Sequence, residues 1–288
     1  MTKRKKIILI LAGVIFLFIL NSPVNFPEGE IVSIKPGTSL REASSLLKEK
    51  NVIRSRILFE ALVVIFDSER HVAYADYFFE NKIPVFAVAR RVSKGEHHLP
   101  QVKVTIPEGF NTKEISETFD GKLSSFDETK FLTSVKGEEG HLFPDTYFFF
   151  PTDNEEDVVS ALRENFKEKI ESVRPQILKS GKSEKNIIIM ASLIEGEAKG
   201  DDDREVISGI LWKRFSIGMP LQVDVALETY KVAGLPKNPI GNPGLEAIKA
   251  AITPKNSPYL YYLHDKDGKI HYARNFEEHK INKSKYLP

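Results

Sequence analysis

The stretch 187-IIIMASLIEGEAKG-200 says most about the fold of this chain, because it places one carboxylate, that of Glu195, at the end of an apolar run. The alanines, leucine, methionine and glutamates of this stretch favour a helix, and Ser183 just upstream supplies an N-cap. At helical spacing Ile188, Ala191 and Glu195 share one face. The pattern therefore predicts a helix whose apolar stripe continues into an acid.

Two interpretations of Glu195 remain open from this helix alone. If the stripe is buried, loss of hydration disfavours the ionised carboxylate and leaves a proton available for general acid catalysis. Alternatively, Glu195 and Glu197 are solvated residues at a fraying helix end beside Gly196 and Gly200. Glu197 lies two residues further on, about 200° around the helix, and is expected to point elsewhere.

Composition sets the outer limits on function. The 288 residues are 41% hydrophobic and 28% charged, which is ordinary globular material with room for about two domains. The 41 basic and 40 acidic residues balance to +1, so a nucleic-acid partner held by a strong positive field is not expected. The chain has no cysteine, which excludes disulfides, zinc thiolates and a cysteine nucleophile. The paired His97 and His98 lack an HExxH-type pattern, so no metal is expected.

The N-terminus predicts a membrane anchor. Basic residues at 3–6 precede an unbroken apolar run at 7–20, a length that suits a signal-peptide core as well as a span. The NSP sequence at 21–23 offers no small-x-small cleavage site, and apolar residues at 24 and 26 extend the segment to about 20 residues. We therefore expect an uncleaved single-pass anchor at 1–26, with a cytoplasmic tip and the remaining chain outside the cytoplasm.

Beyond the anchor, VSIKPG (32–37) and VTIPEG (104–109) resemble each other, and an amphipathic stretch follows each. Each predicts a short strand, a glycine turn and a helix start, although common turn chemistry alone produces such likeness by chance. LFEALVVIF (58–66) is too short for a second span and is expected to form a core helix. Three acids at 201–203 before an apolar run predict another helix start.

A polar link at 93–100 separates two expected domains, 27–100 and 101–288. In the second, further stretches place polar side chains among Gly and Pro turns, as loops that carry functional groups do. They are GHLFPDTY (140–147), GMPLQVD (218–224), GLPKNPIGNPG (234–244) and SPYLYYL (257–263).

Together with IPEG (106–109), ASLIEGE (191–197) and a closing segment at 268–279, these stretches resemble in their order the endolytic murein transglycosylases, the YceG-like family. The resemblance runs from about Glu30 to the C-terminus. It implies an α+β fold with an N-terminal membrane helix, a small LysM-like subdomain at 27–100 and a larger catalytic domain at 101–288, in which helices pack against mixed strands.

By this resemblance the catalytic residue is Glu195, the first glutamate of the E-x-E pair. The implied substrate-binding residues are Gln222, Asp224, Asn242, Tyr147 and Glu197. The sequence departs from the family pattern at Gly196, where lysine is usual, and at Val225, where proline is usual. It also lacks the Y-N-T-Y segment before GLP and keeps only Tyr230, which affects one wall of the expected groove.

The resemblance also implies the chemistry. Ordinary glycosidases need two carboxylates, but muramic acid carries its own nucleophile. Protonated Glu195 would donate to the glycosidic oxygen and then remove the proton of the sugar's 6-hydroxyl, which closes on C1 and leaves a 1,6-anhydro end. No metal or organic cofactor is needed. The implied partners are peptidoglycan glycan strands, the plasma membrane and peptidoglycan synthesis enzymes.

Two alternatives remain. The chain is a non-catalytic module that tethers itself to the cell wall, or it is a hydrolase that pairs Glu195 with Asp224 or Asp145. Mass spectrometry separates the three readings, because they predict anhydro ends, no cleavage, or reducing ends that have gained water.

Overall fold

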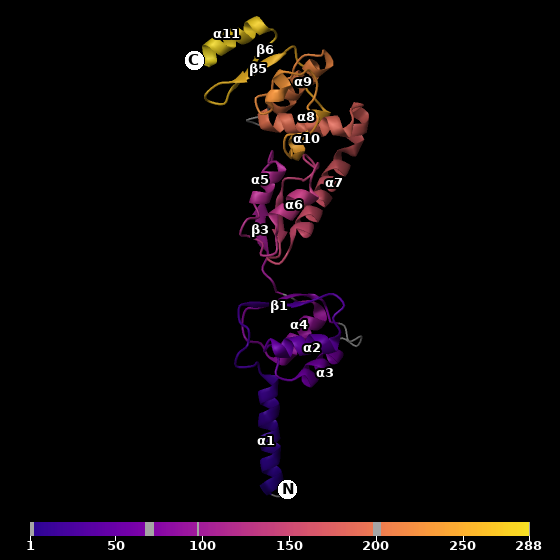
Figure 1. Ribbon diagram of the computed structural model, residues 1–288, viewed down its shortest axis with the longest axis vertical. Coiled ribbons are helices and arrows are strands. Elements are labelled where there is room, and N and C mark those ends of the chain that lie inside the picture. Colours follow the sequence, from indigo (N-terminus) through magenta and orange to yellow (C-terminus); the bar gives the residue numbers. More distant parts are fainter. Residues whose placement is uncertain (1–2, 67–71, 97, 198–202, 288) are drawn as a thin grey trace. The chain divides into compact units, whose positions relative to one another are not determined.

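The computed structural model describes residues 3–66, 72–96, 98–197 and 203–287 (Figure 1). The chain divides into two compact units, Met1–Pro100 and Gln101–Pro288. The acids at 201 and 202 and the histidine at 97 lie outside the described residues.

The first unit begins with helix α1 (Lys3–Leu20). Within the described part of the chain, no helix has both the length and the apolar character needed to cross a membrane. The predicted span is therefore not seen in this structure.

A two-stranded sheet and three helices follow α1 among the described residues of the first unit. Strands β1 (Glu30–Ile34) and β2 (Ala75–Phe79) pair antiparallel, with Val32 opposite Tyr77. These two side chains are buried with others from helices α2 (Leu40–Glu49), α3 (Arg56–Phe66) and α4 (Val85–Lys94). The core helix expected at 58–66 is confirmed as α3. The LysM-like character of the unit stays a prediction.

The second unit opens with strand β3 (Val102–Thr105), helices α5 (Thr112–Glu117) and α6 (Glu128–Ser134), and strand β4 (Thr146–Phe149). The two strands pair antiparallel. Side chains from all four elements form one apolar cluster with the first half of the long helix α7 (Glu155–Ser180). The second half of α7 belongs to a different cluster, so this helix connects two cores.

The second core surrounds helix α8 (Glu184–Glu197), which packs against α9 (Arg204–Ser216) and α10 (Leu245–Ile252). All eight residues from Ile187 to Ile194 are buried, so α8 is enclosed on every side instead of carrying one apolar stripe. Gly209 of α9 permits the close approach of the segment that follows α10, because a Cβ there would lie 2.0 Å from the carbonyl oxygen of Lys255.

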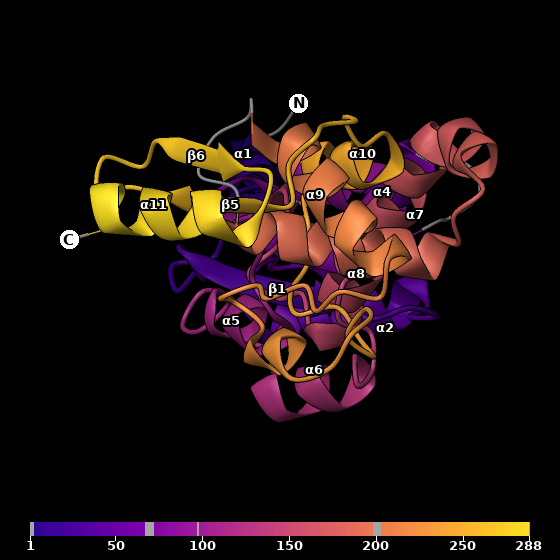
Figure 2. The same cartoon turned by 90° about the horizontal axis from the view of Figure 1, so that it is seen from above.

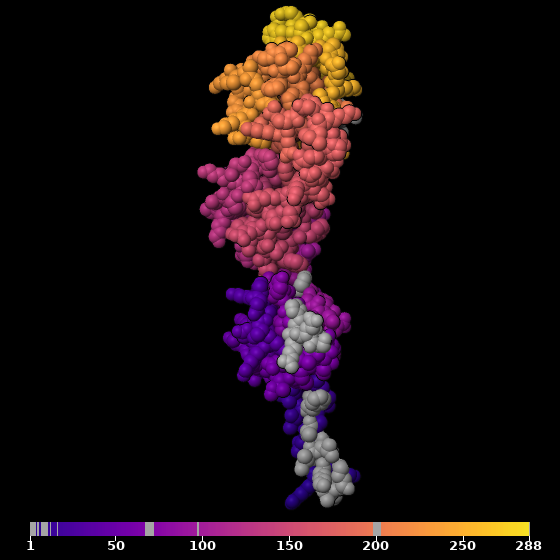
Figure 3. Space-filling view, turned by 90° about the vertical axis from the view of Figure 1, so that its right-hand side faces the viewer, coloured from indigo at the N-terminus to yellow at the C-terminus, as the bar shows by residue number. Residues whose placement is uncertain are grey.

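The chain ends in a hairpin and a helix. Strands β5 (Tyr261–His264) and β6 (Ile270–Ala273) pair antiparallel, and α11 (Phe276–Tyr286) lies along them (Figure 2). In the space-filling view this C-terminal segment adjoins the orange surface of the preceding helices (Figure 3). The described strands form three separate antiparallel pairs. The fold is α+β as predicted, but the expectation of mixed parallel and antiparallel strands is wrong for these strands.

Candidate active site

Glu195 lies near the C-terminal end of α8, where the buried part of this helix stops. The helix starts as predicted, because the hydroxyl of Ser183 accepts a hydrogen bond from the Asn186 amide at 3.2 Å. The Glu195 side chain is 7% exposed. Its Oε1 receives a hydrogen bond from Nη2 of Arg204 at 3.1 Å, and its Oε2 receives one from the backbone N–H of Gly244 at 3.0 Å. The solvated, fraying alternative is therefore wrong for Glu195.

Arg204 places a second carboxylate beside Glu195. Its Nη2 lies 3.8 Å from Oε2 of Glu108, which belongs to the IPEG turn. The side chain of Arg204 is 13% exposed and that of Glu108 is 49% exposed, so Glu108 lies on the solvent side of the buried Glu195. One guanidinium thus faces two carboxylates.

Glycines make room for this arrangement. Gly109 has a φ of +83°, which favours glycine, and a Cβ there would make ordinary van der Waals contact with Cγ of Glu195 at 3.5 Å. A Cβ at Gly244 would lie 1.8 Å from Oε1 of Glu108, which no side chain can accommodate without movement. The IPEG turn and the NPG turn therefore approach the acid through residues that lack a side chain.

Asn242 forms hydrogen bonds that connect the NPG turn to the segment after the IPEG turn. It is 1% exposed, its Oδ1 accepts from the Leu142 amide at 2.9 Å, and its Nδ2 donates to the Phe110 carbonyl and to Glu139 at 2.9 and 2.8 Å. Its backbone also bonds to Gly109 and Phe110. Asn242 is therefore almost fully buried, and both polar atoms of its side chain are bonded to the protein.

Glu197 points away from Glu195, as the helix geometry predicted, and lines a cavity. Its Oε1 accepts from the Asp224 amide and its Oε2 accepts from the Tyr262 hydroxyl, both at 2.9 Å. Burial raises the pKa of the Glu197 carboxyl, the nearby Asp224 charge raises it further, and the hydrogen bond from Tyr262 opposes this. Burial also raises the pKa of Tyr262 well above its usual value.

The same cavity, of about 490 Å³, brings Glu197 together with Gln222 and Asp224. Gln222 has a φ of +52°, a left-handed conformation that is uncommon for a residue with a side chain, and its N–H bonds the Thr229 carbonyl at 3.1 Å. The Tyr230 hydroxyl donates to Asp224, and this bond raises the pKa of Tyr230 to about 12.

Tyr147 belongs to neither group. Its hydroxyl donates to the Phe143 carbonyl at 2.7 Å and accepts from Asn165 at 2.9 Å, and burial raises its pKa to about 12. Asp145 contacts Asn165 at 3.1 Å and Lys169 at 3.8 Å. The carboxylate that shares an arginine with Glu195 is therefore that of Glu108, and not Asp145 or Asp224.

Sequence reasoning missed Glu108, Arg204 and Glu139. Glu108 stands in the quoted IPEG motif, which was interpreted only as a turn, and Arg204 follows the acids interpreted as a helix start. Glu139 accepts from the amide and hydroxyl of Thr112 at 3.2 and 3.1 Å, and burial raises its pKa. No spacing rule indicates that Glu108 meets Arg204 or that Glu139 meets Asn242, because each contact joins segments far apart in the sequence.

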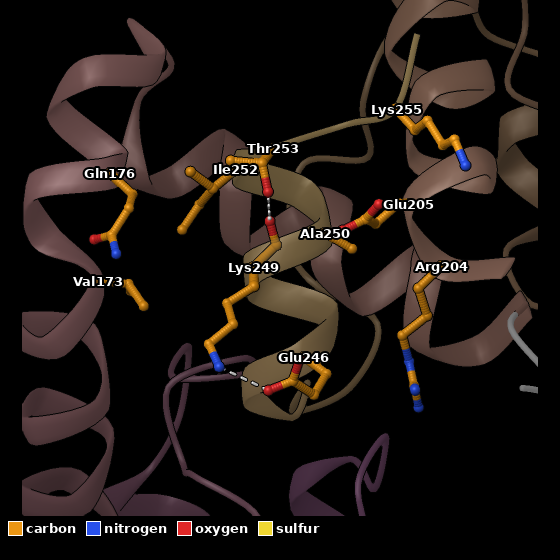
Figure 4. A pocket seen from close by; sticks show the side chains of 10 residues that line it. All are labelled: Val173, Gln176, Arg204, Glu205, Glu246, Lys249, Ala250, Ile252, Thr253 and Lys255. Atoms are coloured by element: carbon orange, nitrogen blue, oxygen red, sulfur yellow. Dashed lines mark hydrogen bonds and ion pairs between the residues drawn. The ribbon is translucent and has the colours of Figure 1, made fainter. Parts of the chain in front are cut away.

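A second hollow lies on the Arg204 side of the site. It has a volume of about 900 Å³, and its lining includes Arg204 and residues of α7 and α10 (Figure 4). Among the described residues, no group of three or more histidine, aspartate and glutamate side chains is placed to hold a metal ion.

The sequence model of the YceG-like family matches residues 32–228 and 226–285. An endolytic murein transglycosylase of Bacillus subtilis is 27% identical over 89% of this chain and 84% of its own length. One from Streptococcus pneumoniae is 23% identical over 89% of this chain, which spans only 58% of that relative. The crystal structure of a YceG-like protein from Listeria monocytogenes shares the fold, with a TM-score of 0.57 and 24% identity, over 88% of this chain and 98% of that one. The family match extends over most of the sequence, and this chain therefore belongs to the YceG-like family.

Proposed function

We propose that this protein is an endolytic lytic transglycosylase, which cleaves the MurNAc–GlcNAc bond within peptidoglycan glycan strands and leaves 1,6-anhydroMurNAc ends. The curated relatives that match most of the chain are named endolytic murein transglycosylases. The observation that carries the proposal is the position of Glu195, a nearly buried carboxylate on a rigid helix at the meeting point of the IPEG and NPG turns.

Glu195 serves as both acid and base in the proposed reaction. Protonated Glu195 donates to the glycosidic oxygen as the bond to C1 breaks. The resulting carboxylate then takes the proton of the 6-hydroxyl, whose oxygen bonds to C1, so that no water is consumed. A helix is a suitable support, because misplacing a catalytic group by about 1 Å costs on the order of a hundredfold in rate.

Arg204 must change partner during this cycle. In the structure Nη2 of Arg204 donates a hydrogen bond to Oε1 of Glu195, a contact that suits an ionised carboxylate. The first step of the proposed reaction instead needs a proton on Glu195. Glu108 lies within 3.8 Å of the same Nη2 and gives the guanidinium a second negative partner when Glu195 is protonated. This arrangement keeps Arg204 from becoming an uncompensated charge in a poorly hydrated site.

The cavity at Glu197 suits the sugar rings. Its amide and carboxylate side chains, Gln222, Asp224 and Glu197, offer hydrogen bonds to hydroxyl and N-acetyl groups, and three tyrosines supply flat surfaces. We assign these residues to substrate orientation. Asn242 contributes indirectly, by fixing the turns around Glu195.

We further propose that the N-terminal segment attaches the protein to the plasma membrane, with its N-terminus in the cytoplasm and residues 27–288 outside. The basic tip and apolar run support this, as do the large apolar side chains of α1 that are more than half exposed, Leu11, Val14, Ile15, Leu17 and Phe18. Such attachment would place the enzyme beside newly made strands and the enzymes that synthesise them.

The test is mass spectrometry of uncrosslinked glycan strands incubated with the full-length protein in detergent. Wild type should give internal cleavage with 1,6-anhydro ends, Glu195→Gln should give none, and Glu164→Gln, a control on exposed α7 surface, should match wild type. Reducing ends that have gained water would instead establish a hydrolase. Intact strands that remain bound to the folded protein would establish a tethering module.

A further inference from the structure

A groove runs over the exposed face of helix α10. Figure 4 shows α10 as its floor, with Val173 and Gln176 of α7 on one side and Arg204 and Glu205 of α9 on the other. Its volume of about 900 Å³ is near the upper end of the usual range for ligand sites. The sugar-orienting residues proposed above line the other cavity, so this groove has no role yet.

The groove adjoins the candidate acid. Arg204 is both part of its wall and the partner of Glu195 at 3.1 Å. Gly244, whose N–H bonds Glu195, is the N-cap of the floor helix α10. One end of the groove therefore meets the place where the glycosidic bond would be protonated.

The substrate requires a surface in this position. The stem peptide of peptidoglycan is attached through the lactyl ether on O3 of muramic acid, the same ring whose C1 bond Glu195 would break. The peptide must therefore leave the site within about one sugar ring of the acid. A groove that begins at Arg204 gives the peptide a path away from the glycan.

The chemistry of the lining also fits a peptide. The groove presents two lysines, Lys249 and Lys255, and two glutamates, Glu205 and Glu246, beside the apolar Ile252. Lys249 and Glu246 form an ion pair at 2.8 Å with side chains 48% and 62% exposed, so both can exchange partners with little loss.

A stem peptide offers the complementary groups, which are carboxylates, an amino group and alanine methyls. The cavity at Glu197 differs, because its lining includes three tyrosines, which can stack on sugar rings, whereas the lining of the groove over α10 includes no aromatic residue. The two hollows thus match the two chemical halves of one substrate.

We propose that the groove over α10 binds the stem peptide of the muramic acid unit on which Glu195 acts, so that the enzyme selects strands that still carry their peptides. This inference rests on the proposed function. It specifies a part of the substrate that the activity alone leaves open.

The experiment compares kcat/KM of the full-length protein in detergent on two substrates, uncrosslinked strands with their stem peptides and the same strands after an amidase has removed them. Wild type should prefer the peptide-bearing strands by about tenfold, the factor that corresponds to 1.4 kcal/mol of binding. The difference should appear mainly in KM, because the peptide contacts exist before and during the reaction.

The Lys249→Ala/Lys255→Ala variant should bring the ratio of the two kcat/KM values close to one. A matched variant, Lys103→Ala/Lys167→Ala, removes two exposed lysines outside the groove and should keep the wild-type ratio. Thermal melting of both variants verifies folding, which the replacement of exposed lysines should not disturb.

Equal wild-type rates on the two substrates would overturn the peptide assignment and leave the activity intact. A groove variant that keeps the full preference would overturn it as well. Failure of folded wild type to cleave either substrate would refute the proposed function itself, so the two failures are distinguishable.

Discussion

Replacing Glu195 with glutamine removes the acid and leaves the shape of the site nearly unchanged. General acid–base catalysis contributes about 10²- to 10⁴-fold to rate, which corresponds to roughly 3–5 kcal/mol of barrier. Because Glu195 is proposed to act first as acid and then as base, we expect a loss near the upper end of this range. We therefore predict that kcat falls about 10⁴-fold.

The same substitution should cost little stability. Breaking a buried ion pair normally costs about 3–5 kcal/mol, because it leaves one charge uncompensated. Here Arg204 keeps Glu108 at 3.8 Å, and the amide oxygen of the new glutamine can still accept from Gly244. We therefore expect a loss of about 1–2 kcal/mol, which lowers the melting temperature by roughly 2–8 °C.

The assay is the release of 1,6-anhydro ends, followed over time by mass spectrometry, with a calorimetric melt of each variant. Glu195→Asp serves as the companion, because it retains a carboxyl group but withdraws it by about 1 Å and should lose on the order of a hundredfold. A folded Glu195→Gln protein with a rate within tenfold of wild type would refute the role of Glu195.

Three other substitutions test the surroundings. Asn242→Ala should lower the free energy of unfolding by about 2–4 kcal/mol in urea, because buried donors and acceptors lose their partners; a loss below 1 kcal/mol would contradict this. Gly209→Ala should lower the melting temperature, because its Cβ would meet the Lys255 carbonyl and overpacking costs about 1–3 kcal/mol, whereas an unchanged temperature would mean that α9 has room. Burial raises the pKa of the Glu197 carboxyl in the folded state above its value in the unfolded state, so the folded state binds the proton more tightly. Wild type therefore gains stability as the pH falls through the pKa of the folded state. Glu197→Gln lacks this gain, so its destabilisation should be larger at pH 5 than at pH 7 in urea titrations; equal losses would contradict the shift.

Local sequence was sufficient to predict helix α8. The helix begins where Ser183 predicted it, and Glu197 points into a cavity whose lining does not include Glu195. The near burial of Glu195 has a different reason from the one predicted, because α8 is enclosed by α9, α10 and loops rather than packed along one stripe. Helical periodicity gives the direction of a side chain, but not the number of neighbours that surround it.

The contacts of the site could not be predicted in this way. Arg204, Glu108 and Gly244 reach Glu195 from segments nine, 87 and 49 residues away along the chain. Asn242 was expected in the groove because of its motif, whereas its side chain is bonded to three residues of two other segments. Motif order identifies residues that matter, but it does not distinguish a group that touches substrate from one that holds a turn.

The sequence by itself determined the family, the α+β class, the helix that carries Glu195 and the glycine turns around it, because these depend on local propensity and on motifs in a fixed order. Only the tertiary structure decided that one guanidinium lies between Glu195 and Glu108, and that Arg204 and Glu197 line two chemically different hollows. The reason is physical. Charge pairing and cavity shape depend on which distant segments meet, and that is fixed by how the two apolar cores, connected through α7, pack in space.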